Sequence, residues 1–261
     1  MAADDRILEV DGISKRFGGL QALEGVDMWV KRGTVHGIIG PNGAGKTTLF
    51  NVITGMTRPD RGRICFEGRS LPPMSPHQLV PLGMSRTFQN IRLFRDMTVE
   101  ENVLVAQHSR TPTYVLSVLL GTSAARVVEA EARRKAREAL AFVGLEAKAG
   151  ELARHLPYGQ QRLVELARAL AADSRLLLLD EPGAGMNPGE KLNLLGLVGQ
   201  LRGRGYTVVL IEHDMKLVMH LCDSITVLDH GRKIAEGPPA TVRNHPDVIR
   251  AYLGKGAGSV A

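Results

Sequence analysis

A glycine-rich run, GPNGAGKTT at residues 40–48, has the spacing G-x-x-x-x-G-K-[ST]. Glycines let the backbone turn its N–H groups toward phosphate oxygens, and a following helix adds the positive end of its dipole. The lysine would neutralise the terminal phosphates, and the next hydroxyl would bind Mg²⁺. We predict a nucleoside triphosphate site at Gly40, Pro41, Asn42, Gly43, Ala44, Gly45, Lys46, Thr47 and Thr48.

A second motif, LLLLDEP at residues 176–182, places two carboxylates after four leucines. The leucines are typical of a buried strand, and ligands of open α/β sheets bind at the carboxyl ends of the strands. We expect Asp180 to hold Mg²⁺ through water, and Glu181 to orient and deprotonate an attacking water. The alternative is an acidic pair that only ends a strand. The two motifs together indicate nucleotide hydrolysis.

The elements that must position these residues are strands and helices in alternation. A short apolar run at residues 35–39 predicts a buried strand before the glycine-rich loop, and a helix is expected at residues 45–54. Further helices are predicted at residues 189–201 and 214–221, and strands at 7–10, 23–30, 63–67, 84–89, 176–179, 207–211, 225–228 and 233–236. This order predicts an α/β fold.

Residues 98–171 differ from the segments on either side, because patterns typical of helices dominate there. A helix is expected to start at Thr98, and another to span residues 158–171. A long amphipathic helix is predicted at residues 124–143, with an apolar face of Val127, Val128, Ala139, Leu140 and Val143. A helical block therefore interrupts the α/β pattern.

Composition excludes several classes of protein. The chain has 261 residues, 44% of them hydrophobic, which is too many for a disordered protein. The net charge of +6 permits an anionic partner, but 4% aromatic residues supply a poor platform for stacking bases, and we expect no nucleic acid. No apolar run reaches membrane-spanning length, and the N-terminus does not resemble a secretory signal. Cys65 and Cys222 form no metal-binding pattern, and we expect them to be buried thiols in a reducing compartment.

A third motif, LPYGQQ at residues 156–161, resembles the LSGGQ signature of ABC-type ATPases. The other motifs of that family occur in its order: Phe17 in KRFGGL, Gln89 in TFQN, GAGMNP at residues 183–188, which is similar to the D-loop, and His213 in IEHD. The resemblance implies that Phe17 stacks on adenine. It implies that Gln89 senses Mg²⁺ and faces the membrane subunits, and that His213 contacts the γ-phosphate during catalysis.

The resemblance also implies an architecture. We expect an α/β P-loop NTPase of the ABC cassette type, with a RecA-like mixed sheet, an N-terminal antiparallel β subdomain and an inserted helical subdomain. The core and β subdomain would take residues 1–90 and 172–261, and the helical signature subdomain residues 91–171. Two cassettes would pair head to tail, so that Pro157, Tyr158, Gly159 and Gln160 reach the ATP of the partner.

Two residues depart from the family pattern. Pro157 stands where a serine usually donates a hydroxyl to the γ-phosphate, and proline has neither that hydroxyl nor an N–H. Proline is well tolerated at the first turn of a helix, so weakened signature contacts are expected. Asn187 stands where the D-loop often has aspartate, so communication between the two sites is expected to differ.

Several segments resemble the ATPase subunits of bacterial importers of branched-chain amino acids: LPYGQQRLVELARAL, TFQNIRLFRDMTVEENV, the long segment at residues 107–129, and the ending PATVRNHPDVIRAYLG. This resemblance implies two membrane permease subunits, a second ATPase subunit that is the same or a related chain, and indirectly a solute-binding protein. The ATPase would be peripheral, on the cytoplasmic face of the inner membrane. Arg92, Leu93, Phe94 and Met97 are candidate docking residues.

Other functions stay open from the sequence. Within the family, the solute could be urea, a short amide or another hydrophobic amino acid. A soluble ABC ATPase of DNA repair or translation usually carries coiled-coil insertions, zinc modules or a second cassette, which this chain lacks. A P-loop kinase or GTPase would leave the signature and His213 unexplained. A catalytically dead cassette is a further alternative because of Pro157.

Overall fold

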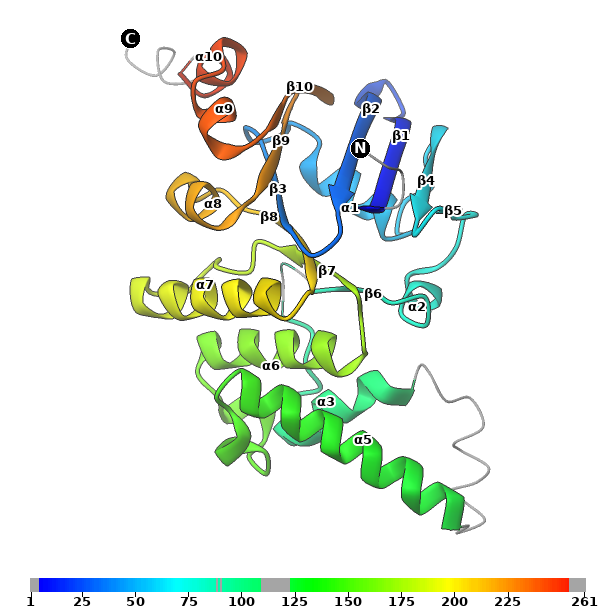
Figure 1. The fold of residues 1–261 in the computed structure, drawn as a ribbon, viewed down its shortest axis with the longest axis vertical. Helices are drawn as coiled ribbons and strands as arrows, with labels where there is room; N and C mark the ends of the chain where they lie inside the picture. Colours follow the sequence, from blue (N-terminus) through cyan, green and yellow to red (C-terminus); the bar gives the residue numbers. More distant parts are fainter. Residues whose placement is uncertain (1–4, 88, 90, 109–122, 254–261) are drawn as a thin grey trace. The chain divides into compact units, whose positions relative to one another are not determined.

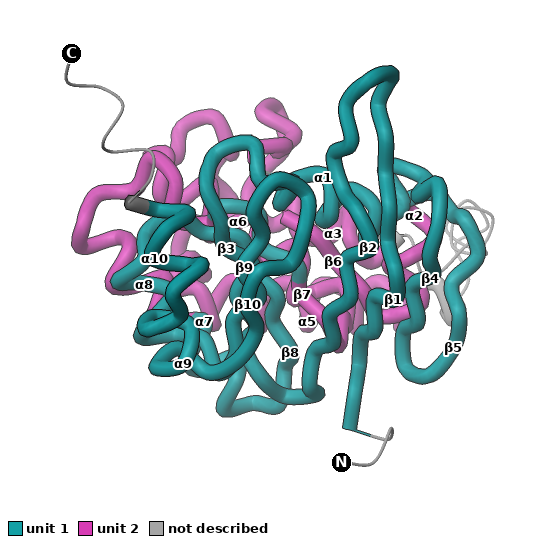
Figure 2. Tube along the Cα trace, turned by 90° about the horizontal axis from the view of Figure 1, so that it is seen from above, with its two compact units in different colours: residues 1–76, 178–181, 198–261 teal, residues 77–177, 182–197 magenta. Residues whose placement is uncertain are grey.

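The computed structural model describes residues 5–87, 89, 91–108 and 123–253. The chain forms two compact units (Figure 2): unit 1 comprises residues 1–76, 178–181 and 198–261, and unit 2 residues 77–177 and 182–197. Unit 2 thus begins at residue 77, before residue 91, where the helical subdomain is predicted to start. It also includes residues 182–197, which follow Glu181. Most of the segment at residues 107–129 that contributes to the family resemblance lies outside the described residues.

Unit 1 contains an antiparallel sheet near the N-terminus. Its strands are β1 (Arg6–Phe17), β2 (Leu20–Lys31), β4 (Arg61–Phe66) and β5 (Arg69–Ser70), in the order β2-β1-β4-β5. β1 and β2 are longer than predicted, because register shifts between Val10 and Ile13 break the apolar alternation of one continuous strand. This sheet corresponds to the expected β subdomain.

The second sheet has the order β10-β9-β3-β8-β7-β6. The strands β3 (Val35–Ile39), β7 (Leu176–Asp180) and β8 (Thr207–Ile211) are buried along their whole length, as their apolar runs predict. β3 pairs in parallel with β8 and with β9 (Ser224–Asp229), and β9 pairs antiparallel with β10 (Arg232–Gly237). β6 (Met84–Arg86) is shorter than predicted. The mixed α/β core that was expected is therefore present (Figure 1).

The helices of unit 1 include α1 (Lys46–Ile53), which follows β3 through the glycine-rich loop, and α8 (Met215–Leu221), which Asp214 caps through its side chain. Two short helices, α9 (Pro239–Arg243) and α10 (Pro246–Leu253), follow β10 (Figure 1). The sequence analysis predicts neither α9 nor α10, and their few residues leave little periodic signal.

Unit 2 is mostly helical. It contains α3 (Val99–His108), α5 (Ser123–Phe142) and α6 (Tyr158–Ala171), which pack on one another, with two 3-10 turns at Glu146–Lys148 and Ala153–His155. α2 (Pro76–Leu79) begins at the boundary, and α7 (Pro188–Gly203) belongs to unit 2 up to residue 197. The helices predicted within residues 98–171 are thus present, and they lie in unit 2.

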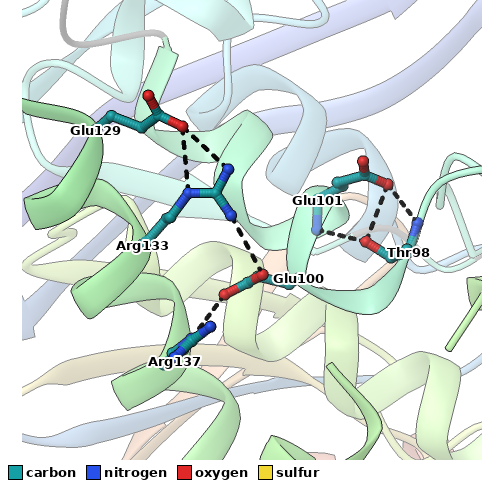
Figure 3. A network of polar contacts seen from close by, with 6 residues as sticks. All are labelled: Thr98, Glu100, Glu101, Glu129, Arg133 and Arg137. Atoms are coloured by element: carbon teal, nitrogen blue, oxygen red, sulfur yellow. Dashed lines mark hydrogen bonds and ion pairs between the residues drawn. The ribbon is translucent and has the colours of Figure 1, made fainter. Parts of the chain in front are cut away.

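Polar contacts fix the start of α3 and join it to α5 (Figure 3). Thr98 and Glu101 form a capping box, because Glu101 accepts from the Thr98 N–H at 2.7 Å and Glu101 N–H donates to the Thr98 hydroxyl at 3.2 Å. These bonds hold the pKa of Glu101 below its usual value. Glu100 lies 2.9 Å from Arg137 and 3.6 Å from Arg133, both on α5.

The predicted apolar face of α5 is only half correct. Ala139, Leu140 and Val143 are buried, but Val127 and Val128 are 69% and 39% exposed. Periodicity in the sequence identifies the apolar side of a helix, but whether a residue on that side is buried depends on the elements that pack against it. Across the part of the chain that is described, no helix is both long and apolar enough to span a bilayer.

His36 is a buried polar residue on β3. Its Nε2 lies 2.8 Å from the Thr226 hydroxyl on β9, and burial, aided by the charge of Lys233, lowers its pKa to about 4. The unfolded chain holds this imidazole at its ordinary pKa near 6.5. Between pH 6.5 and 4 the unfolded state therefore binds more protons than the folded state.

We expect the free energy of unfolding to fall by about 3 kcal/mol from this residue alone as the pH drops from above 6.5 to 4. Urea unfolding of the parent and of His36→Gln, measured from pH 7 to pH 4, checks this. Glutamine can bond to the Thr226 hydroxyl but does not titrate, so the variant should lose less stability on acidification. Parallel pH dependences for the two proteins would contradict the assignment.

Candidate nucleotide site

The glycine-rich loop connects β3 to α1 and wraps around one ammonium group. Lys46 is only 6% exposed, and its Nζ donates to the carbonyl oxygens of Gly40 at 2.7 Å and Pro41 at 2.8 Å. Gly43 and Gly45 have φ angles of +80° and +100°, which favour glycine. No side chain caps α1 at Gly45, so the first N–H groups of the helix have no intrahelical acceptor. This loop can surround an anion with backbone donors and one cation.

Neighbouring segments of unit 1 hold the loop in place. Gly231, in the turn between β9 and β10, donates its N–H to the carbonyl of Ala44 at 3.0 Å, and its own carbonyl accepts from Glu24 on β2 at 2.8 Å. A Cβ atom at Gly45 would lie 2.7 Å from the carbonyl oxygen of Ala22. The close approach of β2 therefore requires glycine at position 45.

The two predicted catalytic residues meet at the ends of adjacent strands. Glu181 follows β7, and its N–H donates to the carbonyl of Ile211, the last residue of β8, at 3.0 Å. His213 comes two residues after β8, and its Nε2 lies 2.7 Å from Oε1 of Glu181. Glu181 has a φ of +47°, an uncommon conformation for a side-chain-bearing residue and one that clusters at functional sites. The imidazole can orient the carboxylate and share a proton with it.

The remaining site residues of unit 1 differ in exposure. Asp180 ends β7 and is 3% exposed, whereas Thr47 on α1 is exposed. Phe17 ends β1 with its ring 49% exposed, and the Lys15 ammonium lies 5.4 Å from the ring centroid. An exposed aromatic ring offers a face on which a planar base can stack.

The signature residues begin α6 in unit 2. Pro157 is the N-cap residue, and no side chain caps the helix there, so the start of α6 presents backbone N–H groups. Gly159 is buried beneath the carboxylate of Glu190, with which a Cβ at position 159 would overlap. A Cβ at Gly185 would lie 2.8 Å from Cε1 of Tyr158. The loop at residues 183–188 therefore packs directly on the signature.

The asparagine that departs from the family pattern has a local explanation. Asn187 Oδ1 accepts from the Glu190 N–H, and the Glu190 carboxylate accepts from the Asn187 N–H, both at 2.9 Å. This reciprocal pair is a capping box at the start of α7, a role that asparagine fills as well as aspartate. The sequence analysis missed Glu190, although an N-cap residue followed three positions later by glutamate is the usual signal.

The sequence analysis also missed a buried ionic cluster on α6. Arg162 donates to the carbonyl of Gln89, Arg168 donates to the carbonyl of Arg92 at 2.7 Å, and Glu165 accepts from the Arg92 N–H at 2.8 Å. Glu165 is 2% exposed, and burial raises its pKa although the flanking arginines oppose that shift. The cluster holds the backbone of Gln89 and of Arg92 against α6. It has no motif signal, since charged residues on a helix usually face solvent.

The structure thus groups the predicted residues in two sets. Unit 1 holds Phe17, residues 40–48, Asp180, Glu181 and His213, and unit 2 holds Gln89, residues 157–160 and Asn187. Glu181 and His213 are in direct contact, as are the signature and the loop that contains Gly185.

Comparison with known proteins decides the family. Residues 23–184 match the ABC transporter family, and residues 232–258 match a segment described as branched-chain amino acid ATP-binding cassette transporter. The chain belongs to the ABC transporter family. The expected ABC cassette fold is confirmed, because a nucleotide-free ATP-binding cassette from an ABC transporter superposes with a TM-score of 0.82 at 35% identity, covering 95% of this chain and 98% of that one.

Curated members of the ABC transporter family match along nearly the whole chain. The high-affinity branched-chain amino acid transport ATP-binding protein BraF of Pseudomonas aeruginosa is 48% identical, over 95% of this chain and 98% of its own. LivG of Escherichia coli K12, which has the same description, is 45% identical over the same shares. A further solved cassette, in its ADP conformation, has a TM-score of 0.81 at 36% identity, covering 95% of this chain and 99% of that one.

Two glycines of the glycine-rich loop form a matched pair for mutation. Both Gly43→Ala and Gly45→Ala place a side chain at positive φ, which costs about 1–2 kcal/mol. Only the second also meets the Ala22 carbonyl, since nothing lies within 4 Å of a Cβ at Gly43. We expect Gly45→Ala to lower the free energy of unfolding at least twice as much and to weaken binding of a fluorescent ATP analogue more. Urea unfolding and titration check this, and equal losses would contradict the packing argument.

Proposed function

We propose that this chain is the ATP-hydrolysing subunit of an importer of branched-chain amino acids. The contact between Glu181 and His213, at the strand ends of the unit that contains the phosphate-binding loop, carries the catalytic part of the proposal. The names of the relatives BraF and LivG support the assignment of branched-chain amino acids as the transported solute. Catalysis would consume ATP and water and release ADP and phosphate.

The residues of unit 1 suit each part of the reaction. The N–H groups at the start of α1 would bind the phosphates, with Lys46 shifting from two carbonyl oxygens to phosphate oxygens. Phe17 would stack on adenine. Glu181 would take a proton from the attacking water, and His213 would orient Glu181 and contact the γ-phosphate.

A magnesium site fits the oxygen donors that are present. Mg²⁺ prefers hydroxyl, carboxylate and water oxygens, and the exposed Thr47 hydroxyl and the Asp180 carboxylate supply two of them. Gln89, in unit 2, is the third proposed ligand. When bound, Mg²⁺ would neutralise charge on the β- and γ-phosphates.

We propose that two cassettes share each ATP. Pro157, Tyr158, Gly159 and Gln160 would meet the partner's ATP through the N–H groups that begin α6. A dimeric post-hydrolysis cassette bound to ADP and phosphate, 25% identical with a TM-score of 0.74, supports this arrangement. The favoured partner is a second, related ATPase subunit, as the family resemblance implies.

The membrane-facing part of the proposal rests on unit 2. The side chains of Arg92, Phe94 and Met97 are exposed, and that of Leu93 is half-buried. This segment begins where Glu165 on α6 binds the backbone N–H of Arg92. We propose that these side chains dock two permease subunits at the cytoplasmic face of the inner membrane, and that a solute-binding protein supplies the amino acid.

We expect Glu181→Gln to lower kcat for ATP hydrolysis about 10²- to 10³-fold, since the amide cannot accept the proton of water. ATP affinity should stay within about twofold. Phosphate release and binding of a fluorescent ATP analogue, each with Glu138→Gln on the exposed face of α5 as a control, check this. Parent-like turnover in Glu181→Gln would remove the catalytic assignment.

Co-purification tests the transport assignment. The tagged chain, recovered from gently solubilised membranes of its host, should bring two polytopic membrane proteins and a second ATPase. Membrane vesicles that contain the complex should take up labelled leucine in preference to labelled urea when supplied with the binding protein. Recovery with soluble partners alone would reject the importer.

A further inference from the structure

The side chain of Tyr158 contacts the loop at residues 183–188 and Arg162 on its own helix. Gly185 lies so close that a Cβ there would be 2.8 Å from Cε1 of the tyrosine ring. Gly185 has a φ of +76°, so this turn of the loop depends on glycine both for its conformation and for its approach to the ring. The loop at residues 183–188 therefore rests on the tyrosine.

Tyr158 also contacts Arg162, one helical turn later. Nη2 of Arg162 donates to the Tyr158 hydroxyl at 2.9 Å, and the guanidinium carbon lies 5.4 Å from the ring centroid. The same Nη2 donates to the carbonyl of Gln89. One planar guanidinium thus joins the tyrosine hydroxyl to the backbone of Gln89.

The guanidinium of Arg162 has little freedom to move. Arg162 is buried, and its Nη1 lies 3.5 Å from Oε2 of Glu165. The other oxygen of Glu165 accepts from the Arg92 N–H and lies 3.5 Å from Arg168. Because a buried charge is expensive to leave without its partner, the cluster holds Arg162 together with the backbone of Gln89 and Arg92.

We propose that Tyr158 is a positioning residue that couples Gln89 and Arg92 to the loop at residues 183–188. Its hydroxyl bonds to Arg162, which holds Gln89, and its ring supports Gly185. The LSGGQ pattern has glycine at this position, which supplies neither contact. This inference rests on the proposed function, in which Arg92 belongs to the segment that docks the permease and residues 157–160 meet the partner's ATP. A displacement at the docking segment would then reach the ATP-facing surface through one side chain.

Two variants of the full chain separate the two contacts. Tyr158→Phe keeps the ring and removes the hydroxyl, whereas Tyr158→Ala removes both. Hydrogen–deuterium exchange reports both ends, through the Arg92 N–H bonded to Glu165 and the Met186 N–H bonded to Gly183. We expect Tyr158→Phe to speed exchange at Arg92 at least fivefold and to leave Met186 within twofold. Tyr158→Ala should speed both, and Tyr206→Phe in unit 1 serves as a matched control that changes neither.

Steady-state hydrolysis tests the positioning role. We expect Tyr158→Ala to lower kcat about tenfold and Tyr158→Phe to give an intermediate value. Affinity for a fluorescent ATP analogue should stay within twofold in both, since the proposed phosphate-binding loop belongs to unit 1 and both variants keep the backbone N–H groups that begin α6. A loss of affinity equal to the loss of kcat would indicate general damage and overturn the proposal.

Equal exchange changes at Arg92 and Met186 in Tyr158→Phe, or parent-like exchange in both variants, would also overturn it. The exchange measurement does not depend on ATP turnover, so it tests the coupling separately from the proposed function. If the parent protein hydrolyses no ATP, that result counts against the proposed function and leaves the exchange test of the coupling in place. Tyr158→Phe keeps the test decisive if the alanine variant fails to fold.

Discussion

The buried ammonium of Lys46 is the constraint on which the glycine-rich loop depends. A cation with 6% of its surface exposed must be surrounded by oxygen atoms, and the loop supplies two of its own carbonyls. The loop can bend back over the lysine only with residues at positive φ, which accounts for the glycines. It then needs support from outside, and the β9–β10 turn and β2 provide it through Gly231 and Ala22. The charge of Lys46 thus accounts for the bend of the loop between β3 and α1, and the contacts with Gly231 and Ala22 support that bend.

The contact between Glu181 and His213 depends on a different constraint, the adjacency of β7 and β8. Strands that end at the same edge of the sheet place Glu181 and His213 2.7 Å apart, although they are separated by 32 positions in the chain. The backbone bond between Glu181 and Ile211 fixes this alignment and holds Glu181 at positive φ. Strain at this position is maintained by the surrounding sheet, as is common where a side chain must be aimed.

The sequence predicts the buried strands and the helix that begins with the LPYGQQ motif well, because short apolar runs and helix-start signals are strong. The ranges 35–39, 158–171 and 207–211 agree with β3, α6 and β8. It fails where burial depends on partners far along the chain. Val127 and Val128 belong to an apolar stripe but stay exposed, whereas Arg162 and Glu165 are charged but buried. Their contacts with Gln89 and Arg92 join positions 73 residues apart, which periodicity cannot detect.

The packing of the signature against the following loop limits how this chain can be recombined. Gly159 lies under Glu190, whose carboxylate also caps α7, and Tyr158 fills the space beside Gly185. Exchanging either segment alone with that of a relative would leave a void or an overlap at this contact. The two segments, separated by more than twenty residues, therefore form one packing unit. A chimaeric protein must take both segments from the same parent sequence.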